Sequence, residues 1–333
     1  MKKQLIISCL SAFLILTSCA FAQPAGDPTL TEKESHMSLA PQIGEETSEM
    51  HIPDQTTVLM LALSSENLHL HETALATLQK MTAEVRIRLD LMPTEALGTE
   101  KEILEDMISG ENTIQCMLLG TETLAELVPE LSVSAEPFRF QTFEDAHAFM
   151  DSEEERSAEQ KLGKYGLRVL GRTDNAFYVL TNSRLHVTEP GDLNGLRIRI
   201  SGEDKGMAVY LEAMGAIPSF VPDSELATAL QMKSLDGQEN SLYTIRNEKL
   251  YLYQPYLSVT NHRYSGLLMI IRESALNSLT DQQYSTLTEA ASSFEKQDRE
   301  AMQLLNEEML AALEAVGMTI TYPELSAFRE TDS

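Results

Sequence analysis

The sequence predicts an α/β protein with two lobes. Its 333 residues, 43% of them hydrophobic, can bury a large core, and a typical size of about 150 residues per domain favours two lobes. From residue 56 onwards, apolar stretches of strand length alternate with helical patterns, as in sheets whose strands are joined by crossover helices. Near the C-terminus, one helical pattern is long enough to lie across both lobes.

Residues 1–22 have the pattern of an export signal. Lys2 and Lys3 give a positive start, and residues 5–16 form an apolar stretch too short to span a bilayer. Two cleavage sites compete. Residues 20–22 (Ala-Phe-Ala) suit the ordinary signal peptidase, whereas residues 16–19 (Leu-Thr-Ser-Cys) resemble a bacterial lipobox. The second is preferred, so we expect an extracytoplasmic protein that is lipidated at Cys19.

Residues 23–55 are predicted to be a flexible tether. They are rich in Pro, Glu, Ser and Thr and have no sustained period, so they bury too little apolar surface to offset the entropy of ordering. Of the three cysteines, Cys9 and Cys19 belong to the leader, so Cys116 should be a free, buried thiol. The formal charge of −26 repels phosphate backbones, and no nucleic-acid partner is expected.

The first predicted lobe begins at residue 56. Its elements, in chain order, are a strand at 56–63, a helix at 71–81, a strand at 85–91, a helix at 99–110 and a strand at 113–119. Thr99 should open its helix and Gly110 should end it. The glutamates at 153–155 are expected at a solvated helix start. His69 and His71 are expected to be exposed rather than to bind a metal.

The pattern continues beyond residue 165. The predicted elements are strands at 167–170, 177–180 and 196–200, a helix at 205–214, a strand at 219–221 and a helix capped by Ser224. In the strand at 196–200 the apolar residues alternate with Arg197 and Arg199. The two arginines therefore share the face opposite the core, where one of them could reach a cleft.

Two further features complete the chain. The helix from Ser224 runs into an Asp-Gly turn at 236–237, followed by the polar residues 238–240, a combination that favours a binding site. Thr280 is a plausible N-cap for a helix from residue 281 to about 316, with Gly317 as its stop. At about 1.5 Å per residue this helix would be roughly 50 Å long.

Six motifs follow one another in the C-terminal half. They are GLRVLG at 166–171, LTNS at 180–183, GDLNGLRIRI at 191–200, AMGAIPS at 213–219, LATALQ at 226–231 and DGQEN at 236–240. In their order and spacing they resemble the substrate-binding proteins of tripartite ATP-independent periplasmic (TRAP) transporters. Residues 96–110 and 136–149 resemble the same family more weakly.

The resemblance implies a periplasmic-binding-protein-like fold whose two lobes close on a solute at a hinge cleft. Lobe I would comprise residues 56–176 with about 265–304, and lobe II residues 177–264 with about 305–333. The implied function is to capture a small organic acid-like solute and deliver it to the membrane permease subunits of a cation-coupled TRAP transporter. The alternative is a lipoprotein that senses a solute or docks another protein without uptake. No catalytic motif was found, so no enzyme activity, cofactor or metal is expected.

The resemblance also selects candidate ligand contacts. Arg199 matches the family arginine that pairs with the solute carboxylate, for which a planar guanidinium offers two parallel donors. Asn240 matches an asparagine that reaches the solute. Gln238 is a further candidate, although Gln238 and Glu239 more often hold the turn. Glu225 matches a family position too, with a capping or packing role as its alternative.

Three departures from the family pattern bear on the ligand. Tyr178 stands where many members have a second arginine, Asp223 where an aromatic residue is usual, and Ala227 at a tyrosine position. A positive charge is lost and a negative one gained, which disfavours a simple dicarboxylate. We expect a monocarboxylate, an amino or hydroxy acid, or a neutral solute. Tyr178 would donate a hydrogen bond to it, and Asp223 would meet an amine or a hydroxyl.

Overall fold

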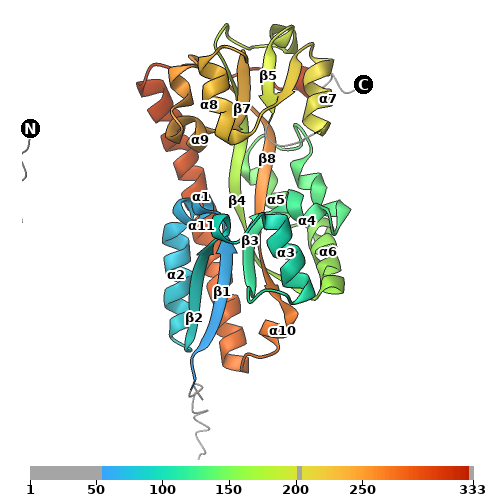
Figure 1. The fold of residues 1–333 in the computed structure, drawn as a ribbon, viewed down its shortest axis with the longest axis vertical. Helices are drawn as coiled ribbons and strands as arrows, with labels where there is room; N and C mark the ends of the chain where they lie inside the picture. The colour runs from blue at the N-terminus through green and yellow to red at the C-terminus, as the bar shows by residue number, and fades with distance from the viewer. Residues whose placement is uncertain (1–54, 201–204, 330–333) are drawn as a thin grey trace, which may run out of the picture. The chain divides into compact units, whose positions relative to one another are not determined.

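The computed structural model describes residues 55–200 and 205–329 (Figure 1). The predicted leader, Cys19 and residues 23–54 of the predicted tether lie outside the described residues. Within the described ranges, none of the helices combines the length and the apolar character that crossing a membrane requires.

A mixed sheet of nine strands runs through the described residues. The strands are β1 (Thr57–Leu63), β2 (Ile87–Pro93), β3 (Cys116–Gly120), β4 (Leu167–Asn182), β5 (Arg197–Ile200), β6 (Ile217–Phe220), β7 (Gly237–Ser241), β8 (Tyr256–Arg272) and β9 (Thr319–Thr321). Their order is β2-β1-β3-β8-β4-β7-β5-β6, with β9 beside β8. The parallel pairs β1/β2, β1/β3, β5/β6 and β5/β7 confirm the predicted α/β class.

The long strands β4 and β8 connect two halves of this sheet. The first half contains β2, β1 and β3 with the adjoining ends of β4 and β8, and the second half contains β7, β5 and β6 with the opposite ends (Figure 1). β4 has 16 residues and β8 has 17, and they pair antiparallel. This continuity differs from the prediction of separate strands at 167–170 and 177–180.

Buried polar pairs explain why β4 continues through the stretch predicted to be a break. Thr173 donates to Asp298, and Asp174 accepts from Tyr264 and contacts His147 Nε2 at 2.8 Å. Because these groups have partners, burying them costs little, and the strand can pass through the interior. The partners come from distant parts of the chain, so the local sequence could not indicate them.

The helices lie on both faces of the sheet. They are α1 (Ser65–Leu70), α2 (Glu72–Ala83), α3 (Glu100–Ser109), α4 (Thr121–Ala125), α5 (Phe143–Met150), α6 (Glu153–Gln160), α7 (Lys205–Ala213), α8 (Asp223–Gln231), α9 (Leu242–Asn247), α10 (Glu273–Leu276), α11 (Asp281–Ala315) and α12 (Ser326–Arg329). Short 3-10 helices occupy Thr94–Ala96, Pro129–Ala135, Lys161–Tyr165, Pro190–Leu193 and Leu250–Leu252. As predicted, Thr99 caps α3 and Gly110 ends it, with a φ of 82° that favours glycine.

Helix α11 confirms the prediction of one long helix that bridges both lobes. It has 35 residues and begins with a capping box between Thr280 and Gln283. Near its start, Leu287 and Phe294 pack into a core of the first half. Near its end, Leu313 packs into a core of the second half.

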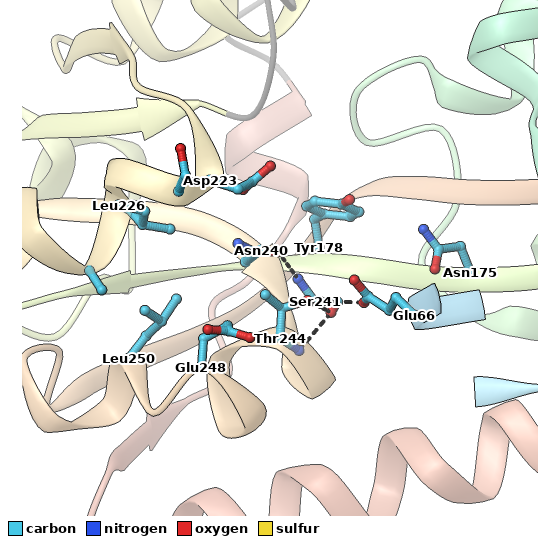
Figure 2. Close-up of a pocket in the computed structure, with 12 residues that line it drawn as sticks. Glu66, Asn175, Tyr178, Asp223, Leu226, Asn240, Ser241, Thr244, Glu248 and Leu250 are labelled. Atoms are coloured by element: carbon cyan, nitrogen blue, oxygen red, sulfur yellow. Dashed lines mark hydrogen bonds between the residues drawn. The ribbon is translucent and has the colours of Figure 1, made fainter. Parts of the chain in front are cut away.

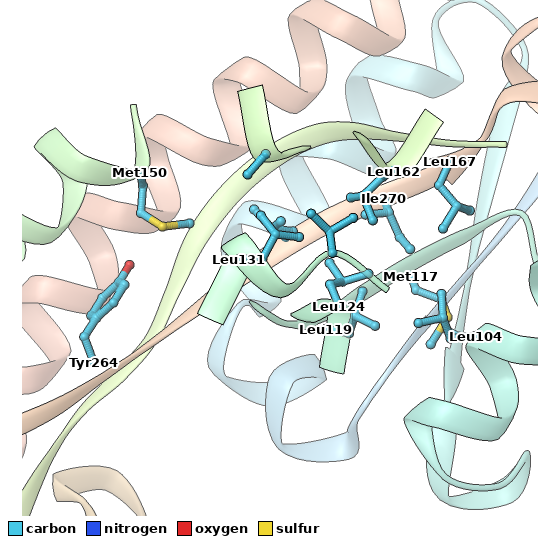
Figure 3. Packing of buried hydrophobic residues seen from close by; sticks show 14 of the residues in the cluster. Leu104, Met117, Leu119, Leu124, Leu131, Met150, Leu162, Leu167, Tyr264 and Ile270 are labelled. Carbon is cyan, nitrogen blue, oxygen red and sulfur yellow. The ribbon is translucent and has the colours of Figure 1, made fainter. Parts of the chain in front are cut away.

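Each half of the sheet has apolar cores of its own. In the first half, α3 and α2 cover opposite faces of the strands. Figure 3 shows part of the core on the α3 side, which includes Leu104, Met117 and Ile270. Cys116 is 2% exposed, and burial raises the pKa of its thiol to about 12. It is therefore the buried, unreactive thiol that was predicted.

Four local predictions were wrong. His71 is fully buried with its Nδ1 2.8 Å from Asp298, and Glu155 is buried rather than solvated. Helix α8 begins at Asp223 with Pro222 as its N-cap, so Ser224 is not the cap. Gly237 of the predicted Asp-Gly turn already belongs to β7, and residues 238–240 lie within this buried strand. His71 contacts Asp298 on α11, far away in sequence, and the pairing of β7 with β4 and β5 buries residues 238–240.

Asp236 joins three segments of the second half. Its carboxylate accepts from Arg197 Nε at 2.8 Å, from Arg184 Nε at 2.7 Å and from the Arg197 backbone at 3.0 Å. These hydrogen bonds, the one from the Arg197 side chain first, lower the pKa of Asp236 from 3.8 to about 2. Its contribution to stability is therefore complete above pH 4 and is lost as the pH falls towards 2.

We expect Asp236→Asn to lower the free energy of unfolding at pH 7 by about 1.5–3 kcal/mol, because charge-assisted hydrogen bonds are lost. Urea denaturation at pH 7 and near pH 2 measures the effect. The difference between the variant and the wild type should shrink at the lower pH. An equal difference at both values would contradict the assigned ionisation.

Candidate functional site

A cavity of about 400 Å³ lies between the two halves of the sheet (Figure 2). Its lining residues are Glu66, Asn175, Tyr178, Asp223, Ser224, Leu226, Ala227, Asn240, Ser241, Thr244, Glu248 and Leu250. The first half contributes Glu66 from α1, and β4 contributes Asn175 and Tyr178 where it passes between the halves. The remainder comes from α8, β7, α9 and the segment after α9. The size suits a small organic molecule.

Strand pairing and helix caps position the polar groups. Tyr178 on β4 pairs with Ser241 on β7, which places both at the cavity. The Ser241 hydroxyl accepts from the Thr244 backbone at 3.0 Å and so begins α9. Thr244 Oγ1 in turn donates to Glu66 Oε1 at 3.3 Å, which links the two halves across the cavity.

Arg199 lies behind the cavity rather than in its lining. Its side chain is fully buried, Nε donates to the Val221 carbonyl at 2.8 Å and Nη2 donates to Asp223 Oδ1 at 2.5 Å. Nη1 has no hydrogen-bond partner in the described part of the chain. The structure therefore brings Arg199 and Asp223 together, and of the two only Asp223 lines the cavity.

Tyr178 lines the cavity with a guanidinium against its ring. The Arg263 guanidinium carbon lies 3.8 Å from the ring centroid, and the two residues are neighbours across β4 and β8. Burial raises the pKa of Tyr178 to about 12, against the opposing effect of Arg263. The phenol consequently stays protonated at neutral pH and can donate a hydrogen bond.

The other three candidates occupy different environments. Asn240 is 5% exposed and lines the cavity; its Oδ1 accepts from the Ser241 backbone at 3.1 Å, and its Nδ2 has no partner among the described residues. Gln238 is fully buried beside β4, where its Nε2 donates to Thr181 Oγ1 at 2.7 Å. Glu225 is exposed on the first turn of α8. Neither Gln238 nor Glu225 lines the cavity.

Three carboxylates line the described cavity, and two of them were not predicted from the sequence. Burial raises the pKa of Glu66, repulsion by Asp223 and Glu248 adds to the shift, and the hydrogen bond from Thr244 opposes it. A signal for Glu66 existed, because it lies three residues beyond the end of the apolar strand β1 and ligands often bind at the carboxyl ends of strands. Glu248 had no such signal, since only the packing of α9 brings it to the cavity.

No group of three or more His, Cys, Asp or Glu side chains within the described ranges has an arrangement that could hold a metal ion. The polar groups of the cavity are instead hydrogen-bond donors and acceptors. Such an arrangement is suited to binding an organic solute.

Residues 62–332 match the profile of a family described as bacterial extracellular solute-binding protein, family 7. The chain belongs to this family. Family 7 contains the periplasmic solute-binding proteins of TRAP transporters, which work with membrane permease subunits and are not enzymes. The predicted family and the two-lobed α/β fold are thereby confirmed.

Known family 7 proteins match over most of the fold. The chain is 30% identical over 205 residues to the 2,3-diketo-L-gulonate-binding periplasmic protein YiaO of Escherichia coli, an alignment that covers 62% of each chain. A TRAP protein structure from Ochrobactrum anthropi has a TM-score of 0.78 at 25% identity and covers 83% of this chain and 87% of its own. A second TRAP protein structure, from Haemophilus influenzae with bound L-gulonate, has a TM-score of 0.70 at 26% identity. It covers 83% of this chain and 90% of its own.

Proposed function

We propose that this family 7 protein captures a small organic acid-like solute in the cavity and delivers it to a TRAP-type, cation-coupled membrane permease. The observation that carries the proposal is the cavity between the halves. Asn240 lines this cavity, and its side-chain Nδ2 has no hydrogen-bond partner among the described residues. A buried donor without a partner is costly, and a solute acceptor would satisfy it. The relatives named for diketogulonate and crystallised with L-gulonate support an acid of this size.

We further propose that solute capture closes two lobes, formed by residues 56–176 with about 265–304 and 177–264 with about 305–333. The separate cores of the two halves support this division. The register of β4 against β8 shifts between Asp174 and Ala176 and between Tyr178 and Leu180, beside the cavity. Such irregularities bend strands locally, so this part of β4 is the proposed hinge.

The proposed ligand contacts are Tyr178, Asp223 and Asn240, which line the cavity. Arg199 is proposed to act on the solute through its hydrogen bond to Asp223. Gln238 and Glu225 are proposed to act only indirectly, through the packing of β7 and α8. We also propose an extracytoplasmic location with lipidation at Cys19, no enzyme activity and no nucleic-acid partner. The charge of −26 supports the last of these.

A thermal-shift screen tests the proposed function. The panel contains L-gulonate, D-gluconate, D-erythronate, lactate and the corresponding amino acids. At a hundredfold excess over its Kd, a ligand stabilises the folded state by about 2.7 kcal/mol, which raises the Tm by roughly 5–10 °C. Asn240→Ala should reduce the shift, whereas Asn277→Ala, at an exposed asparagine outside the cavity, should leave it unchanged. A panel without any shift would contradict the proposal.

A further inference from the structure

The charge of the cavity differs from what an acid-binding site requires. Among the described residues that line it, Glu66, Asp223 and Glu248 carry carboxylates, and none is a lysine or an arginine. We call these three residues the acidic wall. A purely anionic solute in this cavity would be repelled by the acidic wall without a facing cation to compensate.

The acidic wall is formed by both halves of the sheet. Glu66 comes from α1 in the first half, whereas Asp223 on α8 and Glu248 after α9 come from the second half. Figure 2 shows Glu66 on one side of the cavity, with Asp223 and Glu248 on elements of the other half. Their mutual repulsion helps to raise the pKa of Glu66, so the carboxylates act on one another across the cavity.

The two arginines that contact lining residues are each paired with a carboxylate of the chain, while Nη1 of Arg199 has no partner among the described residues. Arg199 donates to Asp223 and to the Val221 carbonyl. Arg263 donates to Glu239 at 3.2 Å and stacks on Tyr178, whose ring lines the cavity. Among the described residues, one carboxylate matches each of these arginines, so Glu66 and Glu248 leave the lining with a net negative charge.

Asn240 adds an independent requirement. Its side chain is 95% buried, being 5% exposed, and its Nδ2 donor lacks a partner among the described residues although it lies at the cavity. An amide N–H needs an acceptor, which a carboxylate or hydroxyl oxygen supplies. A matching solute must thus present an acceptor to Asn240 and a positive charge to the acidic wall.

We propose that the cavity takes a zwitterionic solute, a small acid that also carries a protonated amine. The acid group accepts from Asn240 Nδ2, and the ammonium group lies against Glu66 and Glu248. This inference rests on the proposed function, because it names the chemical class of the solute captured in the same cavity.

Matched pairs of compounds test the inference by titration calorimetry at pH 7. D-Gluconate is compared with 2-amino-2-deoxy-D-gluconate, and L-lactate with L-alanine, so that one hydroxyl is exchanged for one ammonium group. In at least one pair the amino compound should bind tenfold tighter or more. Tighter binding of the hydroxy compound in both pairs would overturn the inference and leave the proposed function standing. Binding of none of the four, together with an unresponsive thermal-shift panel, would overturn both.

Isosteric variants distinguish the loss of a carboxylate charge from a disturbance of the fold. Glu66→Gln combined with Glu248→Gln should weaken binding of the amino compound at least tenfold. Binding of the hydroxy compound should stay unchanged or become tighter. The control is Glu105→Gln combined with Glu111→Gln, which removes the same charge from exposed positions on and after α3 and should alter neither affinity more than twofold. Equal weakening of both compounds by the first pair of substitutions would contradict an ammonium contact.

Discussion

Asp223→Asn is expected to raise the affinity for a hydroxy acid such as D-gluconate about a hundredfold. Asp223 is 76% exposed at the cavity and holds the buried Arg199 at 2.5 Å. A solute carboxylate about 6 Å away would be repelled by roughly 3 kcal/mol at an effective dielectric constant near 20, which corresponds to about a hundredfold in Kd. The asparagine removes this repulsion and leaves the positive charge of Arg199 without its ionic partner.

Titration calorimetry of the wild type and the variant measures this change. The same substitution should weaken binding of 2-amino-2-deoxy-D-gluconate, so that the preference between the two compounds moves towards the hydroxy acid. Glu212→Gln is the matched control, because Glu212 lies on α7 in the same half, is exposed and does not line the cavity. It should change either affinity less than twofold. A hydroxy-acid affinity that stays within threefold in Asp223→Asn would refute the repulsion assigned to Asp223.

Glu239→Ala is expected to lower the free energy of unfolding by about 3–5 kcal/mol. Glu239 is fully buried, with Oε2 3.1 Å from His262 Nε2 and Oε1 3.2 Å from Arg263 Nη2. Removing one partner of a buried ionic network leaves the opposing charge uncompensated, and that accounts for most of the loss. Tyr178, which stacks on Arg263, should be displaced as well.

Urea denaturation followed by circular dichroism measures the loss. Glu212→Ala serves as the comparison, because an exposed glutamate on α7 should contribute less than about 0.5 kcal/mol. If Glu239→Ala lost less than 1 kcal/mol, the network would not have the structural importance assigned to it.

The fold was predictable where the signal is local. Strands β1 to β3 have apolar or alternating patterns, and α3 and α11 carry caps and stops next to their apolar faces, so short windows of sequence were sufficient. β4 was not recognised as one strand because Thr173 and Asp174 are polar and their partners lie far away in sequence. Likewise, residues 238–240 of β7 were not recognised as a strand, because they are polar and follow an Asp-Gly pair that is typical of turns.

The candidate site followed from motif positions only in part. The family pattern selected Tyr178, Asp223 and Asn240, all of which line the cavity. It could not indicate that Asp223 would engage Arg199, since that contact depends on how α8 packs against β5. Glu66 and Glu248 are 182 positions apart (248 − 66) and meet only through the fold, so neither was selected.

A crystal structure with the tightest-binding member of the thermal-shift panel tests most directly that this cavity is where a solute is captured. We predict the solute between the two halves, with an oxygen atom within hydrogen-bond distance of Asn240 Nδ2 and of the Tyr178 hydroxyl. We also predict that its cationic group, if present, contacts Glu66 or Glu248. A solute bound elsewhere, for example in the surface groove between Arg168 and Tyr284, with this cavity empty, would contradict the account.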